Sequence, residues 1–164
     1  MRRYVLKTGW LMIELLRREF VVRVPLNEAW DRLAEVEKWP EWAMHIRRIG
    51  VSPSGPLGGK TAGTIHLRNG IRSTFVMTAF DPPRRWTWQG KFLWLSVRYD
   101  HLFEAIDSAG TRLIWIVEGN GFLVSVLGPL FARIYVRNLD KAIPRCITWI
   151  EESQLNSDAI MPVC

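Results

Sequence analysis

The sequence predicts an α+β domain in which a seven-stranded antiparallel sheet curls around one long C-terminal helix. Three observations predict it. Segments that alternate polar and apolar residues follow one another between residues 44 and 118, joined by turn-like sequences. A single stretch near the C-terminus has the 3.6-residue period of an amphipathic helix. The chain has 164 residues, which is enough for one domain with a substantial core.

The first strand is expected from Leu16, because residues 16–24 alternate between apolar and mainly charged side chains. We expect the domain to span residues 12–154. Residues 1–11 are then an extension that packs loosely or not at all, and residues 155–164 are a C-terminal tail.

Two short helices are expected directly after the first strand. Pro25 opens a helix over residues 25–39, and Pro40 ends it. The sequence WPEW at 39–42 then predicts a short second turn. The buried stripe of the first helix is expected to comprise Ala29, Trp30, Leu33 and Val36.

Six further strands are expected, joined by hairpin connections. Asn69-Gly70 is typical of a two-residue hairpin turn, and Asp81-Pro82-Pro83 indicates a turn by composition. Consecutive hairpins give an antiparallel meander. The expected strands are 44–52, 60–68, 71–80, 84–90, 93–106 and 111–118.

The long helix is expected over Leu130–Glu152, with apolar residues on one half and charged residues on the other. Pro129 suits its first turn, whereas Pro144 is expected to bend it. A sheet curled around one helix leaves space between the two, and this space is the natural place for a pocket.

Four segments carry a resemblance to a known superfamily: PLNEAWDRLAEVEKWPEW (25–42), FDPPRRWTW (80–88), HLFEAIDSAGTRLIWIVEG (101–119) and GPLFAR (128–133). The chain resembles the START-like, helix-grip proteins over about residues 14–152. It is most similar to the bacterial polyketide cyclase/dehydrase and lipid-transport group, often called SRPBCC proteins. The resemblance implies the helix-grip fold and a cavity, but the superfamily hosts carriers, receptors and enzymes, so it names no reaction.

The resemblance also implies which side chains face inward to form an aromatic-rich pocket. Ala105 is expected to face inward as well, and Asp100, Glu104 and His66 to face outward. The expected ligand-binding wall comprises Ile65, Leu67, Phe75, Met77, Trp86, Trp88, Tyr99, His101, Phe103, Trp115, Phe131, Tyr135 and Asn138.

The favoured function is binding of a small hydrophobic or aromatic molecule, such as a lipid, an isoprenoid or a polyketide-like compound, by a carrier or sensor. The alternative is a cyclase or dehydratase that moves one proton with His101 or Tyr135, the candidate catalytic residues. No carboxylate is expected beside His101 to complete a triad. The three histidines are scattered and no cofactor motif is present, so neither a metal nor a cofactor is expected.

The net charge is +6, and nine Lys and Arg against two acids lie between residues 41 and 98. This excess fits either a solvated outer sheet face, which we favour, or weak contact with an anionic membrane. No nucleic-acid-binding motif is present, the oligomeric state is left open, and two unpaired cysteines favour the cytoplasm. The membrane contact would use Arg47, Arg48, Lys60, Arg84 and Arg85.

Overall fold

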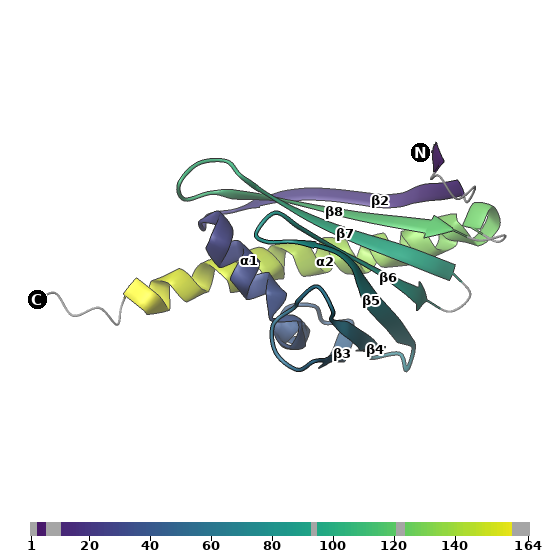
Figure 1. The fold of residues 1–164 in the computed structure, drawn as a ribbon, viewed down its shortest axis with the longest axis horizontal. Helices are drawn as coiled ribbons and strands as arrows, with labels where there is room; N and C mark the ends of the chain where they lie inside the picture. Colours follow the sequence, from purple (N-terminus) through teal and green to yellow (C-terminus); the bar gives the residue numbers. More distant parts are fainter. Residues whose placement is uncertain (1–2, 6–10, 93–94, 121–123, 159–164) are drawn as a thin grey trace, which may run out of the picture.

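The computed structural model describes residues 3–5, 11–92, 95–120 and 124–158. In these ranges one antiparallel sheet of eight strands wraps around the long helix α2 (Val124–Asp158) (Figure 1). The strand order is β1-β2-β8-β7-β6-β5-β4-β3. The strands are β1 (Arg3–Val5), β2 (Leu11–Val22), β3 (Ile46–Ser52), β4 (Ala62–Leu67), β5 (Arg72–Asp81), β6 (Arg85–Phe92), β7 (Leu95–Ala105) and β8 (Thr111–Asn120).

The seven strands expected from the sequence all form, and they make the predicted curled sheet. β2 begins at Leu11 rather than at Leu16, and its first residues pair with the additional short edge strand β1. Residues 1–2 and 6–10 of the expected extension, and 159–164 of the expected tail, lie outside the described residues. No helix in the described ranges is both long and apolar enough to cross a membrane.

The first short helix ends earlier than the sequence predicted. α1 spans Leu26–Ala34, and a separate 3-10 helix, η1, spans Val36–Glu41 with Pro40 inside it. The predicted continuation to residue 39 was wrong because the last carbonyls of α1 have partners elsewhere. Trp39 Nε1 donates to the Leu33 carbonyl at 2.9 Å, and the Leu57 amide donates to the Ala34 carbonyl at 3.0 Å.

The long helix extends beyond its expected range at both ends. It starts at Val124, so Pro129 lies inside the helix and the prediction that it occupies the first turn was wrong. The second half of α2 is tied to the rest of the fold by polar contacts. Arg18 binds Asp140 with two bonds of 2.7 and 3.2 Å, and Trp149 Nε1 donates to Glu41 at 2.7 Å.

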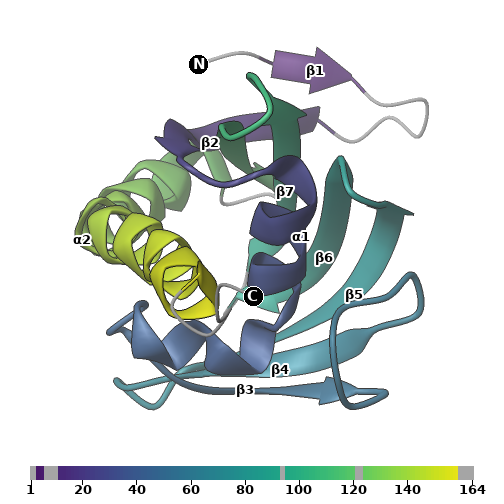
Figure 2. The same ribbon diagram turned by 90° about the vertical axis from the view of Figure 1, so that its left-hand side faces the viewer.

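Figure 2 shows the sheet curving from β2 through β6 and β5 to β3, with α1 and α2 on its concave side. The resulting trough is filled where α1 covers it. Trp30 of α1 packs against Phe80, Trp86 and Phe103, with ring centroids 4.9 to 5.5 Å apart. Ala105, expected to face inward, is exposed because it is the last residue of β7.

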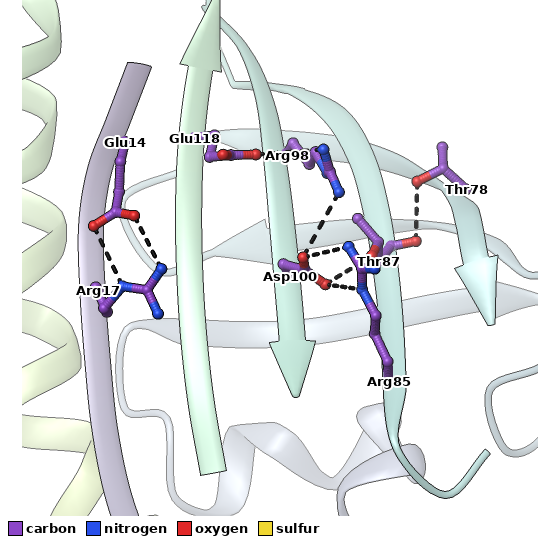
Figure 3. Close-up of polar contacts among 8 residues, drawn as sticks. All are labelled: Glu14, Arg17, Thr78, Arg85, Thr87, Arg98, Asp100 and Glu118. Atoms are coloured by element: carbon purple, nitrogen blue, oxygen red, sulfur yellow. Dashed lines mark hydrogen bonds and ion pairs between the residues drawn. The ribbon is translucent and has the colours of Figure 1, made fainter. Parts of the chain in front are cut away.

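The convex face of the sheet carries paired charges (Figure 3). Asp100 accepts hydrogen bonds from Arg85 at 2.8 and 2.6 Å and from Thr87 Oγ1 at 2.7 Å, and Arg98 lies 3.5 Å from Glu118. Burial alone would raise the pKa of Asp100, but the hydrogen bonds from Arg85 and Thr87 outweigh it and hold that pKa below its usual value. Asp100 therefore faces outward, as predicted, and so does the exposed Glu104.

Part of the basic excess predicted for this region is neutralised, since Arg85 and Arg98 both pair with acids. Arg47, Arg48 and Lys60 are exposed. His66, expected to face solvent, is half-buried on β4, where its strand neighbours are Arg48 and Arg72.

Candidate ligand-binding cavity

A cavity of about 230 Å³ lies between the concave face of the sheet and α2. Its walls come from η1 and the turn after it, from strands β3 to β8 and from the first half of α2, whereas α1 contributes none of them. The trough therefore has a filled end under α1 and a hollow end toward the hairpin between β4 and β5. The lining comprises Trp39, Trp42, Ala43, His45, Ile46, Ile65, Leu67, Asn69, Ile71, Ser73, Trp88, Leu95, Tyr99, His101, Trp115, Leu130, Phe131, Ile134, Tyr135, Asn138 and Leu139.

Nine of the thirteen residues predicted for the pocket line this cavity. They come from four strands and from α2, so the fold brings together residues that are up to 73 positions apart in the sequence. That these residues contact a ligand remains a prediction. The nine are Ile65, Leu67, Trp88, Tyr99, His101, Trp115, Phe131, Tyr135 and Asn138.

The other four, Phe75, Met77, Trp86 and Phe103, do not line the cavity. Trp86 and Phe103 lie in the filled end, packed on Trp30 of α1. Phe75 packs on Trp88 with ring centroids 4.5 Å apart, and Met77 is half-buried beside a bulge in β5. These residues are on the predicted face of the sheet but lie away from its hollow part.

Several wall residues were missed from the sequence, and four of them had a visible signal. Trp39 and Trp42 are the aromatic residues of the WPEW turn, and both are buried in the wall. Leu130 and Ile134 continue the helical spacing that placed Asn138 in the predicted wall, at intervals of four residues. The spacing alone would have added them.

The wall is aromatic, but it offers hydrogen-bond groups that the described protein does not use. The indole nitrogens of Trp42, Trp88 and Trp115 and Nδ1 of His101 are buried without a partner within the described residues. Trp39, by contrast, donates to a backbone carbonyl. Buried donors are normally satisfied, so an acceptor group that reached these nitrogens would supply a hydrogen bond that the described residues leave unmade.

One further indole nitrogen, that of Trp86, is buried without a partner in the described part of the chain, yet it lies outside the cavity. The Trp86 ring stacks on the His101 ring at 5.1 Å. This side chain supplies a natural comparison, because its unused donor belongs to a residue of the filled core.

The ionisable groups of the wall are uncharged at neutral pH. Burial lowers the pKa of His101 to about 3, with only a small opposing effect from Asp100 on the other face. Burial also lowers the pKa of His45 and raises the pKa values of Tyr99 and Tyr135. The cavity therefore favours an uncharged occupant, because none of its described wall residues carries a charge that could balance one on the ligand.

The described residues contain no group of three or more His, Cys, Asp or Glu that could hold a metal ion. Cys146 is buried in the core outside the cavity wall, and burial raises the pKa of its thiol, which makes it a poor nucleophile. The chemistry available in the wall is thus hydrogen bonding, aromatic contact and proton transfer through His101 or Tyr135.

A family model for polyketide cyclase/dehydrase and lipid transport matches residues 15–146, a range that includes every residue of the cavity wall described above. The chain belongs to this family. Among functionally curated proteins, none matches the sequence significantly.

Solved structures show that this family member has the helix-grip fold. A hypothetical protein, jhp0584, from Helicobacter pylori has a TM-score of 0.70 at 14% identity, over 82% of this chain and 86% of that one. The Zhui aromatase/cyclase from Streptomyces sp. R1128 has a TM-score of 0.59 at 15% identity, over 85% and 91%. Major latex-like protein 151 from Panax ginseng has a TM-score of 0.65 at 11% identity, over 84% and 96%. At these identities the likeness concerns the fold alone.

Proposed function

We propose that this family member is a carrier or sensor that binds an uncharged, largely apolar molecule bearing a hydrogen-bond acceptor such as a carbonyl oxygen. Polyketide-like compounds, isoprenoids with oxygen functions and lipid esters all meet this description. The observation that carries the proposal is the set of three unused indole donors, on Trp42, Trp88 and Trp115, in one aromatic wall.

The size of the cavity limits the buried part of the ligand. An apolar cavity of about 150 Å³ holds one benzene ring, so a cavity of about 230 Å³ holds one to two rings. The wall residues Leu130 and Ile134 are 58% and 59% exposed, which places them at an opening. A longer molecule would extend outward past them.

The acceptor requirement is tested by comparing 1-tetralone with tetralin, two-ring molecules that differ by one carbonyl group. Equilibrium dialysis measures their dissociation constants. We expect 1-tetralone to bind about fivefold or more tightly, because one net hydrogen bond contributes about 1 kcal/mol. Trp88→Phe or Trp115→Phe keeps an aromatic ring but removes the donor, so at least one of them should abolish most of this preference.

Trp86→Phe is the matched control, because it removes an unused indole donor from the filled core rather than from the cavity. Its preference for 1-tetralone should equal that of the original protein. Equal binding of the two probes, or the same loss in Trp86→Phe as in the cavity variants, would contradict the proposal. Native mass spectrometry of the freshly expressed protein should also reveal a neutral, oxygen-bearing ligand that co-purifies.

A cyclase or dehydratase is the second candidate, favoured by Nδ1 of His101, which has no partner within the described residues. With a pKa of about 3 and no carboxylate behind it, His101 is a weak general base near pH 7. Tyr135, whose pKa is raised, would remain a proton donor. An enzyme predicts that His101→Ala or Tyr135→Phe abolishes turnover of a polyketide substrate while circular dichroism stays unchanged; unaltered turnover in both would rule out these roles.

A further inference from the structure

The first half of α2 carries exposed apolar side chains at the cavity opening. Leu130 and Ile134 are the two most exposed large apolar side chains in the described part of the chain, at 58% and 59%. They lie one helical turn apart, and both belong to the cavity wall. Three of the other exposed large apolar residues are scattered, with Val21 on β2, Val76 on β5 and Ile106 after β7.

Basic side chains flank this pair on the same helix. Arg133, Arg137 and Lys141 are exposed and follow one another at intervals of four residues, so they form one row beside Leu130 and Ile134. Within the described residues none of the three has an ion pair. We call Leu130, Ile134, Arg133, Arg137 and Lys141 the rim patch.

Acidic side chains are absent from the sequence of α2 between residues 124 and 139. The next acid, Asp140, is bound by Arg18 with two hydrogen bonds, so its charge is already balanced. A third apolar side chain, Met44, is 50% exposed between two wall residues, Ala43 and His45. The opening is therefore bordered by aliphatic groups and by an uncompensated row of cations.

We propose that the rim patch docks the cavity opening onto an anionic lipid bilayer. Aliphatic side chains flanked by Arg and Lys on one helix face have the character of interfacial helices, in which the apolar groups enter the acyl region and the cations meet lipid phosphates. A nucleic acid backbone would satisfy the cations but leave Leu130 and Ile134 in water. An acidic protein partner would instead predict no binding to vesicles that contain only lipid.

This surface differs from the basic sheet face considered from the sequence alone. Arg47, Arg48 and Lys60 are exposed too. Arg47 and Arg48 lie on β3 and Lys60 lies in the loop before β4, and none of them has a pair of exposed aliphatic wall residues on its own element. Docking through α2 would instead bring two residues of the cavity wall directly to the lipid. An apolar molecule could then pass between bilayer and cavity with little exposure to water.

Co-sedimentation with phosphatidylcholine vesicles containing phosphatidylglycerol tests the proposal. Binding should increase with the phosphatidylglycerol fraction and weaken as salt is added. Each cation near an anionic surface contributes about fivefold to partitioning, so Arg133→Glu/Arg137→Glu/Lys141→Glu should weaken binding by about 100-fold or more. Leu130→Ser/Ile134→Ser should weaken binding at every salt concentration, because it removes the apolar contribution.

Two control variants match these changes on other surfaces. Arg47→Glu/Arg48→Glu/Lys60→Glu has the same net charge as the first variant, and Val76→Ser/Ile106→Ser removes two aliphatic groups of similar exposure. Both controls should retain vesicle binding within a few fold. No binding by the original protein, binding indifferent to phosphatidylglycerol, or equal losses in the controls would overturn the proposal.

The outcome is separable from that of the ligand hypothesis. The 1-tetralone affinity in solution reports on the cavity alone. Arg133→Glu/Arg137→Glu/Lys141→Glu changes no residue of the cavity wall, so this variant should leave the 1-tetralone affinity nearly unchanged. If 1-tetralone binds but vesicles do not, the docking surface is refuted while the cavity function stands.

Discussion

At the scale of single residues, His101 is the most strongly perturbed histidine. It lies between the rings of Trp86, Trp88 and Trp115, with centroids 4.9 to 5.7 Å from its own. Such surroundings favour the neutral imidazole, which is why its pKa falls to about 3 from the usual 6.5. A neutral ring can accept or donate a hydrogen bond to a ligand without the cost of burying an ion.

This shift predicts loss of stability in acid. Between pH 6.5 and about 3 the unfolded chain binds a proton at His101 that the folded chain does not. The free energy of unfolding should therefore fall as the pH drops through this window, by at most about 1.4 kcal/mol per pH unit from this residue. Urea unfolding at several pH values measures the slope.

His101→Phe removes the titrating group but keeps a ring, so its stability should fall less steeply between pH 6.5 and 3. His45→Gln removes the second histidine whose pKa is lowered by burial. Comparing its pH dependence of stability with that of His101→Phe shows how much of the slope each histidine contributes. A slope in His101→Phe as steep as in the original protein would mean that His101 is protonated in the folded state.

Strand alternation together with the family resemblance predicted which face of the sheet most of the predicted wall residues occupy, but not their position along the trough. Trp86 and Trp88 lie two residues apart on β6, so they face the same side of the sheet, and both are almost fully buried. Only Trp88 reaches the cavity, because Trp30 of α1 covers Trp86 from above. Where a helix crosses a sheet is a tertiary property, and period-2 alternation carries no information about it.

At the scale of elements, β5 and β6 pass each other closely at Gly90. A Cβ atom added there would lie 2.0 Å from the carbonyl oxygen of Thr74, a backbone atom that cannot rotate away. Gly90→Ala should therefore destabilise the fold by about 3 kcal/mol or more through distortion of the central sheet. The change in the midpoint of urea unfolding measures it.

Gly50→Ala on β3 is the control, since a Cβ there meets nothing within 4 Å. It should change the unfolding free energy by less than about 1 kcal/mol. The change should be stabilising if the reduced conformational entropy of the unfolded chain is the main effect of the substitution. Equal effects at Gly50 and Gly90 would show that backbone entropy, not the close approach, governs both sites.

Helix boundaries were the least predictable part of the elements. The residues at 35–39 continue a helical pattern, yet α1 stops at Ala34 because an indole and a loop amide bind its final carbonyls. Both donors depend on long-range packing that a local pattern does not contain. The long amphipathic helix was recognised because its apolar face is periodic over many turns, even though both of its ends differ from the prediction.

At the scale of the whole molecule, an occupied cavity should stabilise the fold. A ligand that binds only the folded state contributes about 2.7 kcal/mol when its concentration is 100 times its dissociation constant. For a chain of this size that corresponds to a rise in melting temperature of about 5–10 °C. Calorimetry with increasing 1-tetralone should show a melting temperature that rises with the logarithm of concentration.

Ala43 lines the cavity and is fully buried, so Ala43→Met should occupy part of its volume with a flexible side chain. Without ligand, this variant should have a melting temperature close to that of the original protein. Its melting temperature should rise less when 1-tetralone is added. A full response in Ala43→Met would place the probe outside the cavity.

The division of α2 into a wall half and an anchored half has a consequence for how such proteins diversify. The wall residues of the helix lie between 130 and 139, whereas its polar anchors are at Asp140, Trp149 and Glu151. Substitutions in the first half alter what the cavity accepts while the second half keeps the helix in place. Selection can therefore reshape the cavity at little cost in folding, because the contacts that hold the helix in place lie outside the cavity wall.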